Sequence, residues 1–266
     1  MTIINRFYKG LLGLFLACGG LLTSCVMEEE MITKAGQATV RIELNADAAF
    51  GPETKAVNEE DYTNINSYQV EIRKNDANGD IVKNGLYSTL STGVTLQRGN
   101  YYIKAYKGAE HVSSQDEFYA VGSTSFSIVD ENTKNISFTC EPTCAKCQVI
   151  FDANMNEYFS DYYVTYSTAA LGSSTVRSTK TNTAPWYLKV NTNEEVKATI
   201  HLTRKSDSKT NTGEWKYTLS PNQGWTLKIK ANNNTSEGNL GITITIDEGT
   251  NDIPINIEVP SDWIKN

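Results

Sequence analysis

Three cysteines lie close together in the middle of the chain, at the spacing C-x3-C-x2-C: Cys140, Cys144 and Cys147. Clustered thiolates are the ligands of zinc sites and of iron–sulfur clusters. Such a site requires the sulfur atoms to converge on one point from a suitable backbone. It also requires a compartment in which the thiols stay reduced and the metal is supplied. The chemistry open to these cysteines therefore depends on where the chain is exported and which strands carry them.

The N-terminus predicts export. Residues 1–24 carry Arg6 and Lys9 and then an apolar stretch from Leu11 to Leu22, which is short for a membrane span and typical of a signal peptide. The sequence Leu-Thr-Ser-Cys at 22–25 resembles the bacterial lipobox. That resemblance implies that Cys25 becomes the mature N-terminus with acyl chains on its sulfur and amino group. More than one acyl chain anchors a protein stably without a spanning helix. The competing interpretation is an ordinary signal peptide that contains a cysteine.

An acidic run follows the cysteine, at Glu28, Glu29 and Glu30. Acids beside a lipid anchor repel anionic head groups, so they do not assist membrane binding. The run resembles the export tag of Bacteroides-type surface lipoproteins, which implies an outer-membrane protein exposed on the cell surface. The alternative is a solvated tether over residues 25–35. In either case the chain folds outside the cytoplasm, where disulfides are permitted and an oxygen-sensitive cluster is not expected.

Composition and periodicity predict an all-β protein. The formal net charge is −7 and falls further when Arg6 and Lys9 are removed with the leader, which argues against a nucleic-acid partner. Valine, threonine and tyrosine recur in alternating patterns bounded by turn residues, as expected of half-buried strands. One short helical turn is expected over 59–65. The clearest strand segments in the first half are 38–44, 67–74, 93–106 and 123–140.

The second half repeats this order. Segments 145–152, 160–168 and 187–202 match the successive strands of the first half, and 242–259 resembles its closing hairpin. About seven strands in each half fit two tandem antiparallel β-sandwiches. The predicted boundaries are signal peptide 1–24, acidic tether 25–35, N-terminal sandwich 36–140, linker 141–144 and C-terminal sandwich 145–266. A single large barrel is the alternative.

A family resemblance supports this organisation. The stretches ETKAVNEEDYTNINSYQVEI, LQRGNYYIKAY, FYAVGSTSFSI and SFTCEPTCAKCQVIFD are similar to Bacteroides-type surface lipoproteins of unknown function, which are grouped with fimbrillin-like and cell-adhesion proteins. The match is good over residues 36–168 and positional beyond them. The resemblance implies transthyretin-like sandwiches and a role in adhesion or appendage assembly. It implies no catalytic residues and no cofactor. The partners it implies are the membrane, fimbrial subunits, host proteins or glycans.

The strand pattern answers the question about the cysteines. Cys140 ends one predicted strand and Cys147 lies in the next, so we expect them to point into two different cores as small apolar residues. Neither zinc nor iron–sulfur ligation is expected, and Cys147→Val is predicted to be close to neutral. The family resemblance implies a pair at Cys140 and Cys144. Whether they form a disulfide or remain two free buried thiols is left open by the sequence.

Catalytic motifs are lacking, so no enzyme is predicted. His111 and His201 are expected to be surface or loop residues. The spacing of Asp76, Asn78 and Asp80 resembles a calcium loop, but the dipeptide Asn78-Gly79 favours a hairpin turn there.

Two positions remain as candidate sites. Trp186 and Trp225 lie next to turns and are candidates for glycan contacts, although tryptophans in a sandwich core are the more common case. Lys55 lies in a Gly- and Pro-containing segment and is a candidate protease site. In fimbrillins, cleavage after a basic residue releases the first strand and lets subunits polymerise. The alternative at Lys55 is a flexible loop whose first strand stays docked. An adhesive or fimbria-associated lipoprotein is therefore the leading prediction, with a carbohydrate-binding lipoprotein of a glycan-uptake system as the alternative.

Overall fold

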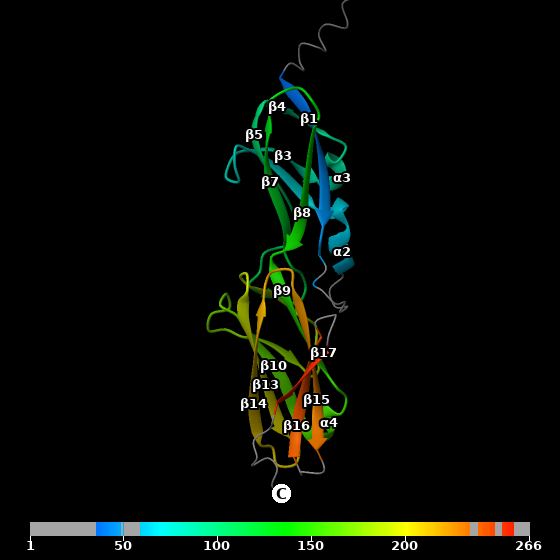
Figure 1. Cartoon of the computed structure of the whole chain (residues 1–266), viewed down its shortest axis with the longest axis vertical. Coiled ribbons are helices and arrows are strands. Elements are labelled where there is room, and N and C mark those ends of the chain that lie inside the picture. Colours follow the sequence, from blue (N-terminus) through cyan, green and yellow to red (C-terminus); the bar gives the residue numbers. More distant parts are fainter. Residues whose placement is uncertain (1–35, 49, 51–58, 235–238, 248–251, 258–266) are drawn as a thin grey trace, which may run out of the picture. The chain divides into compact units, whose positions relative to one another are not determined.

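The computed structural model describes residues 36–48, 50, 59–234, 239–247 and 252–257, all but Gly36 within the compact unit Gln37–Asn266. The chain is all-β in its described part, with a few short helices (Figure 1). The elements of the first half, in order, are β1 (Gln37–Ala46), α2 (Glu59–Thr63), the 3-10 helix η1 (Ile65–Ser67), β2 (Gln69–Lys74), β3 (Ile81–Leu86), α3 (Tyr87–Leu90), β4 (Val94–Gln97), β5 (Gly99–Lys107), β6 (Ser113–Ser114), β7 (Ala120–Ile128) and β8 (Lys134–Pro142).

The second half is built mainly of strands as well. Its elements are β9 (Cys144–Phe151), α4 (Met155–Tyr158), β10 (Phe159–Ser167), β11 (Val176–Thr179), β12 (Trp186–Lys189), β13 (Glu194–Arg204), β14 (Thr210–Leu219), β15 (Gly224–Asn234), β16 (Asn239–Asp247) and β17 (Asp252–Ile257). The alternating burial of β1, β5, β10 and β13 confirms the period-2 pattern read from the sequence.

Two hydrophobic cores organise the described residues. The first core is the buried cluster that runs from Ala38 to Cys144 and also includes Tyr187, and the second runs from Ala145 to Ala231. Tyr187 belongs to the second half by sequence but packs in the first core. The described strands thus surround two cores and do not form one large barrel.

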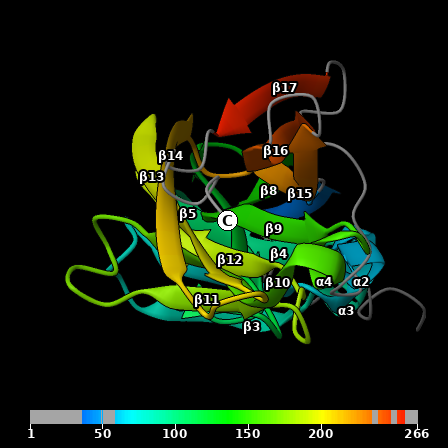
Figure 2. The same ribbon diagram turned by 90° about the horizontal axis from the view of Figure 1, so that it is seen from below.

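The strand order repeats between the halves. The first half forms the sheet β3-β2-β5-β7-β8-β1-β4. The second half forms β11-β10-β13-β14 and β17-β16-β15-β9-β12, and β6 of the first half extends the latter sheet next to β12. β9, β12 and β15 thus occupy the places of β1, β4 and β8. Figure 2 shows β13 and β14 on one side and β15, β16 and β17 on the other, as two separate layers.

The antiparallel prediction is wrong for two strand pairs. β1 is parallel to β8 and β9 is parallel to β15, while the remaining pairs between described strands are antiparallel. Alternating hydrophobicity shows which face of a strand is buried but carries no information on the direction of a distant partner. Because the first strand of each half pairs with a strand far along the chain, its direction is set by topology.

Two further details differ from the sequence-based organisation. The hairpin β16–β17 is not the counterpart of β7–β8, because β14 and β15 hold those places and β16–β17 extends the sheet beyond the repeat. The predicted linker 141–144 is also mostly strand, since β8 ends at Pro142 and β9 begins at Cys144. The intervening Thr143 donates its N–H to the Tyr119 carbonyl oxygen at 2.9 Å, which holds this connection in place.

A close backbone contact joins the two layers of the first half. β7 and β8 pair only at Ala120–Pro142 and Val121–Glu141. Elsewhere β7 pairs with β5 and β8 pairs with β1, so the sheet divides here into two layers. At this point a Cβ on Gly122 would lie 2.1 Å from the Thr139 carbonyl oxygen. A residue without a side chain is therefore required where the strands approach.

Candidate functional site

Several predicted site residues lie outside the described part of the chain. These are the lipidation site Cys25, the acidic residues Glu28, Glu29 and Glu30, and the candidate protease site Lys55. Their roles remain predictions.

The cysteines point into different cores, as predicted. Cys140 lies in the first core and Cys147 in the second, and both are fully buried. Cys144, at the start of β9, also packs in the first core. The described residues contain no group of three side chains placed to bind a metal ion.

The Cys140–Cys144 disulfide is not formed in this structure, where both thiols are free. The Cys140 Sγ instead donates a hydrogen bond to the Ala105 carbonyl oxygen of β5 at 3.3 Å. Burial raises the pKa of Cys140 and of Cys147 to about 12, so thiolates are scarce at neutral pH. Burial also raises the pKa of Cys144, with a smaller contribution from Cys147, its neighbour along β9. All three cysteines are therefore packing residues with low reactivity.

The two candidate glycan tryptophans line the second core. Trp186 on β12 and Trp225 on β15 both lie in register with Cys147, one on each side of it, and pack against the second core. Trp225 stacks on Tyr217 with ring centroids 4.6 Å apart and an interplanar angle of 16°. Both rings are partly buried against the second core, which agrees with the core alternative named above, and the glycan contact stays a prediction.

A buried hydrogen bond ties Cys147 to a tyrosine that the sequence did not single out. The Tyr217 hydroxyl donates to the Cys147 Sγ at 3.5 Å, and burial raises the tyrosine pKa far above its ordinary value. A buried hydroxyl that loses its partner retains the full cost of desolvation. Cys147 is thus more than a small apolar residue, and the expectation that valine replaces it neutrally no longer holds.

Cys147→Val should lower the free energy of unfolding by about 1–3 kcal/mol, because the Tyr217 hydroxyl loses its acceptor. The measurement is urea unfolding followed by tryptophan fluorescence. In a Tyr217→Phe background the same substitution should cost much less, because no hydroxyl is left to satisfy. Equal costs in the two backgrounds would show that the hydrogen bond is unimportant.

A buried ion pair lies where the two halves meet. The Lys146 ammonium on β9 contacts the Glu59 carboxylate at the start of α2, and the Lys146 side chain is 3% exposed against 22% for Glu59. The Tyr187 hydroxyl donates to the same Glu59 carboxylate oxygen at 2.9 Å. A charge this deeply buried is tolerated because it is paired.

Aromatic rings surround this ion pair. Phe118 contacts Phe50, Tyr62 and Tyr187 with ring centroids 4.9, 3.7 and 5.0 Å apart. A Cβ on Gly224 would lie 2.4 Å from the Phe50 carbonyl oxygen, so the backbones of the two halves also touch closely. The junction cluster comprises the residues Phe50, Glu59, Tyr62, Phe118, Lys146 and Tyr187.

Edge pairing reinforces the junction cluster. The short strand β6 of the first half pairs with Tyr187 and Leu188 of β12 and so extends a sheet of the second half. Beside it, the Gln115 side-chain amide donates to the Ala184 carbonyl oxygen at 2.8 Å. No sequence pattern indicates this junction, because Glu59 and Lys146 are 87 residues apart and each resembles a surface charge when considered alone.

Glu59→Gln should lower the free energy of unfolding by about 3–5 kcal/mol, because it removes the carboxylate that faces a buried ammonium. Lys146→Met should cost less, because Glu59 reaches water and keeps its hydrogen bond from Tyr187. Urea unfolding of the two variants measures the difference. Lys197→Met, which breaks an exposed pair with Glu214, is the control and should change little. A Glu59→Gln variant as stable as that control would contradict the assignment.

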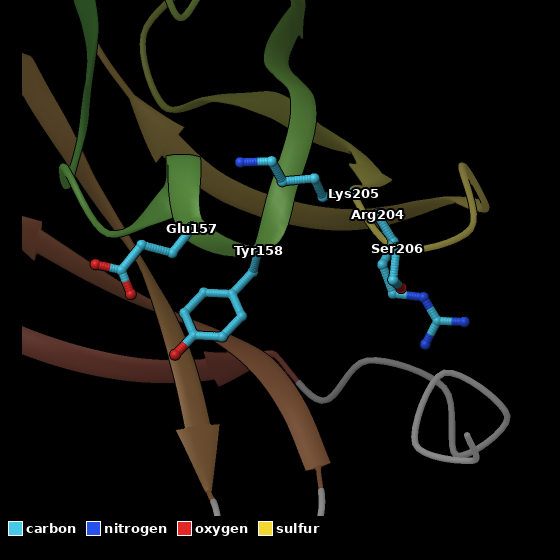
Figure 3. Close-up of a pocket in the computed structure, with 5 residues that line it drawn as sticks. All are labelled: Glu157, Tyr158, Arg204, Lys205 and Ser206. Atoms are coloured by element: carbon cyan, nitrogen blue, oxygen red, sulfur yellow. The ribbon is translucent and has the colours of Figure 1, made fainter.

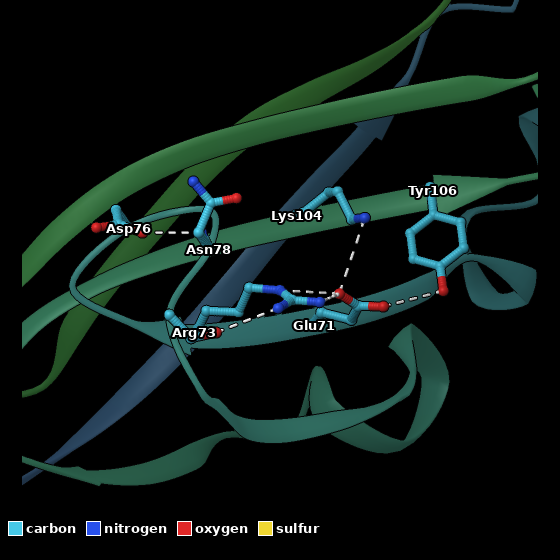
Figure 4. A network of polar contacts seen from close by, with 7 residues as sticks. Glu71, Arg73, Asp76, Asn78, Lys104 and Tyr106 are labelled. Atoms are coloured by element: carbon cyan, nitrogen blue, oxygen red, sulfur yellow. Dashed lines mark hydrogen bonds and ion pairs between the residues drawn. The ribbon is translucent and has the colours of Figure 1, made fainter.

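A polar network covers the outward face of β2 and β5 (Figure 4). The Glu71 carboxylate accepts hydrogen bonds from Arg73 at 2.8 Å and from the Tyr106 hydroxyl at 3.1 Å, and Lys104 lies 3.8 Å away. Burial alone would raise the pKa of the Glu71 carboxyl, but the Arg73 hydrogen bond and the Lys104 charge lower it below its ordinary value. Glu71 is therefore a structural anion and unsuited to act as a general acid.

The neighbouring loop is a turn, as predicted. The Asp76 carboxylate accepts the backbone N–H of Asn78 at 2.8 Å, and the Gly79 N–H donates to the Asp76 carbonyl oxygen at 3.1 Å (Figure 4). The Asp76 side chain is engaged in its own turn, which explains the calcium-like spacing without an ion.

The outward face of β10 and β13 carries a stack of rings. His201 stacks on Tyr163 with ring centroids 4.3 Å apart, and the Arg177 guanidinium lies over the Tyr163 ring, 3.9 Å from its centroid. Burial, helped by the Arg177 charge, lowers the pKa of His201, which keeps the imidazole neutral at physiological pH. His111, by contrast, is an exposed loop residue 2.8 Å from Glu117. At these distances the rings and the guanidinium are in contact, so there is no room for a substrate between them.

An open pocket of about 290 Å³ lies beside α4. Glu157, Tyr158, Arg204, Lys205 and Ser206 line it (Figure 3). Its walls are tied together by the Lys205 N–H, which donates to the Tyr158 carbonyl oxygen at 2.8 Å. Figure 3 shows the Arg204 guanidinium and the Glu157 carboxylate pointing in different directions, so their charges do not converge. One carboxylate without an opposed partner does not suit glycoside hydrolysis.

The fold and these surfaces define a class of protein: tandem β-sandwiches with buried cysteines, an ion-paired junction and polar outward faces. The chain belongs to the family described as "Domain of unknown function (DUF4493)", whose model matches residues 36–261. None of the curated proteins matches the chain. Among the residues that the structure describes, no helix is long and apolar enough to cross a membrane.

Solved structures with a similar fold come from Bacteroides and Porphyromonas species. A "putative cell adhesion protein" from Bacteroides eggerthii is 13% identical, with 80% of this chain and 96% of that chain covered and a TM-score of 0.46. The fimbrial anchor protein Mfa2 from Porphyromonas gingivalis is 10% identical, with 84% and 100% covered and a TM-score of 0.37. "Putative polysaccharide binding proteins" from Bacteroides thetaiotaomicron give 12% identity, 85% and 99% coverage and a TM-score of 0.41.

Proposed function

We propose that this protein is a non-catalytic lipoprotein of the cell surface that acts in adhesion, or as a tip or anchor subunit of a fimbria. Acyl chains on Cys25 hold it in the outer membrane, and residues 25–35 form the tether. The acidic run Glu28–Glu30 directs it to the cell exterior. Its partners are then the membrane and other fimbrial subunits, host proteins or glycans.

The position of β1 supports this proposal best. β1 is the first described strand after the proposed tether, and it lies between β8 and β4, bonded to both. Its side chains Val40, Ile42 and Leu44 are buried in the first core. The strand nearest the anchor is thus an integral part of the sandwich. A chain attached in this way suits a firmly held platform on the cell surface.

The outward sheet faces suit contact with a partner. They present tyrosines beside cationic side chains: Lys104 lies over the Tyr106 ring, and Arg177 over Tyr163. Tyrosine and arginine supply contact area and hydrogen bonds at low entropic cost and are enriched in protein interfaces. Faces with these residues are suited to adhesion.

The junction cluster bears on the candidate protease site. Lys55 lies in the chain between Phe50 and Glu59, and both of these residues belong to the junction cluster. Both ends of the loop are therefore held, and β1 is paired along its length. Cleavage after Lys55 should leave the first strand in place, which favours an anchor or adhesin over a polymerising pilin.

Cys25→Ser should abolish labelling of the protein by a fatty-acid probe and release it from the membrane fraction, because no acyl chain remains. Labelling equal to that of the unmodified protein would refute lipidation at this residue. Replacing Glu28, Glu29 and Glu30 with glutamine tests the export tag separately. Labelling should persist in that variant, whereas protease added to intact cells should no longer digest the protein.

Limited trypsin digestion should cut first after Lys55, since exposed Pro- and Gly-flanked loops are preferred sites. The cut protein should stay monomeric and membrane-bound, because β1 keeps its pairing with β8 and β4. Size-exclusion chromatography and membrane fractionation test this outcome. Lys55→Gln, which removes the cleavage site, is the matched control. Oligomers that form after cleavage and are absent from the control would instead support a pilin.

The pocket beside α4 favours a second candidate function, the binding of carbohydrate by a lipoprotein of a glycan-uptake system. A half-buried tyrosine next to Arg204 and Ser206 can stack on a sugar ring and bond its hydroxyls. If this function holds, purified protein should bind members of a glycan array, and Tyr158→Ala should reduce that binding at least tenfold. Trp186→Phe, which alters the second core, is the control. Binding that is unaffected by Tyr158→Ala would exclude the pocket.

A further inference from the structure

The parallel pair β1–β8 places the two chain exits of the first sandwich at opposite ends. Seven residue pairs, from Val40–Lys134 to Ala46–Cys140, hold the strands in register. The chain enters β1 at Gln37, on the side of the proposed tether. It leaves β8 at Pro142 and passes through Thr143 into β9.

Tension between the tether and the second sandwich would pull these two strands along their common axis. The force acts on the N-terminal end of β1 and on the C-terminal end of β8. Because the strands are parallel, these ends lie at opposite ends of the pair, and all seven residue pairs are loaded together. An antiparallel pair with the same exits would open one residue pair at a time, because both loaded ends would lie together.

Side-chain packing adds to this resistance. Ile42 lies in register with Ile136 and Leu44 with Phe138, on the face that packs in the first core. Sliding one strand past the other must therefore break the backbone hydrogen bonds and expose apolar surface at once.

The second half repeats the arrangement. β9 pairs in parallel with β15 from Lys146–Gly224 to Phe151–Ile229. The chain enters β9 from the first sandwich, so the strand that receives the tension is again held in a parallel pair.

We propose that the β1–β8 pair is a shear clamp: it transmits tension from the anchored N-terminus to the second sandwich while the fold stays intact. The biological meaning of the clamp rests on the proposed function as an anchored surface protein. Its mechanical property does not, because that property follows from the strand pairing.

The test pulls one protein in two geometries by single-molecule force spectroscopy. The mature chain in a Cys25→Ser background carries one handle at its N-terminus and a second on an introduced cysteine. Glu141→Cys loads β1 and β8 in shear, because residue 141 is at the C-terminal end of β8. Asn132→Cys lies in the turn before β8, next to the N-terminal end of β1, and unzips the same residue pairs. Both introduced sites are exposed, whereas Cys140, Cys144 and Cys147 are buried and do not react.

The rupture force should be several-fold higher through residue 141 than through residue 132. Equal forces, or a weaker shear geometry, would overturn the clamp. A second pair of handle sites, Thr139→Cys and Thr133→Cys, should reproduce the ratio and guards against a variant that folds poorly. The measurement uses purified protein without cells or ligand, so a negative adhesion assay does not affect it. Conversely, equal rupture forces would refute the clamp and leave the adhesion proposal to its own tests.

Discussion

The pairing of the first strand of each half with a strand far along the chain is the constraint on which the structure depends. β1 lies between β8 and β4, and β9 lies between β15 and β12. Each of these strands completes one layer of its sandwich and carries side chains into its core. Since Val40 and Lys134 must meet before the layer exists, this pairing costs loop-closure entropy that the buried side chains must offset.

The junction cluster follows from the same arrangement. A single residue, Thr143, separates β8 from β9, so the first residues of β9 are covered by both halves. Cys144, Ala145, Lys146 and Cys147 are all buried. A lysine in such a position requires a carboxylate, and the first residue of α2 provides it. Tyr187 donates a hydrogen bond to this carboxylate, and its ring packs against Phe50 and Phe118. The two sandwiches are thus joined by a tertiary interface as well as by the chain.

The candidate surfaces differ from an enzyme site in a physical sense. The polar side chains of the outward faces bond to one another: Glu71 to Arg73 and Tyr106, and Tyr163 to His201 and Arg177. In these two networks the polar groups of the described residues are engaged with one another. Tyrosine-bearing faces of this kind are consistent with the adhesive role proposed above, and the parallel strand pairs suit the tension that the proposed anchor would transmit.

The sequence by itself determined the strands, their buried faces and the separation of Cys140 from Cys147 into two cores, because alternation with period two is a local property. It also determined the turn at Asn78-Gly79 and much of the repeat between the halves. Only the tertiary structure decided the parallel direction of β1 and β9, the extra hairpin β16–β17 and the packing of Trp186 and Trp225 against the second core. It likewise decided that Lys146 meets Glu59 and that Tyr217 meets Cys147. These contacts join residues far apart in the chain, and their chemistry depends on burial that no local pattern of residue types records.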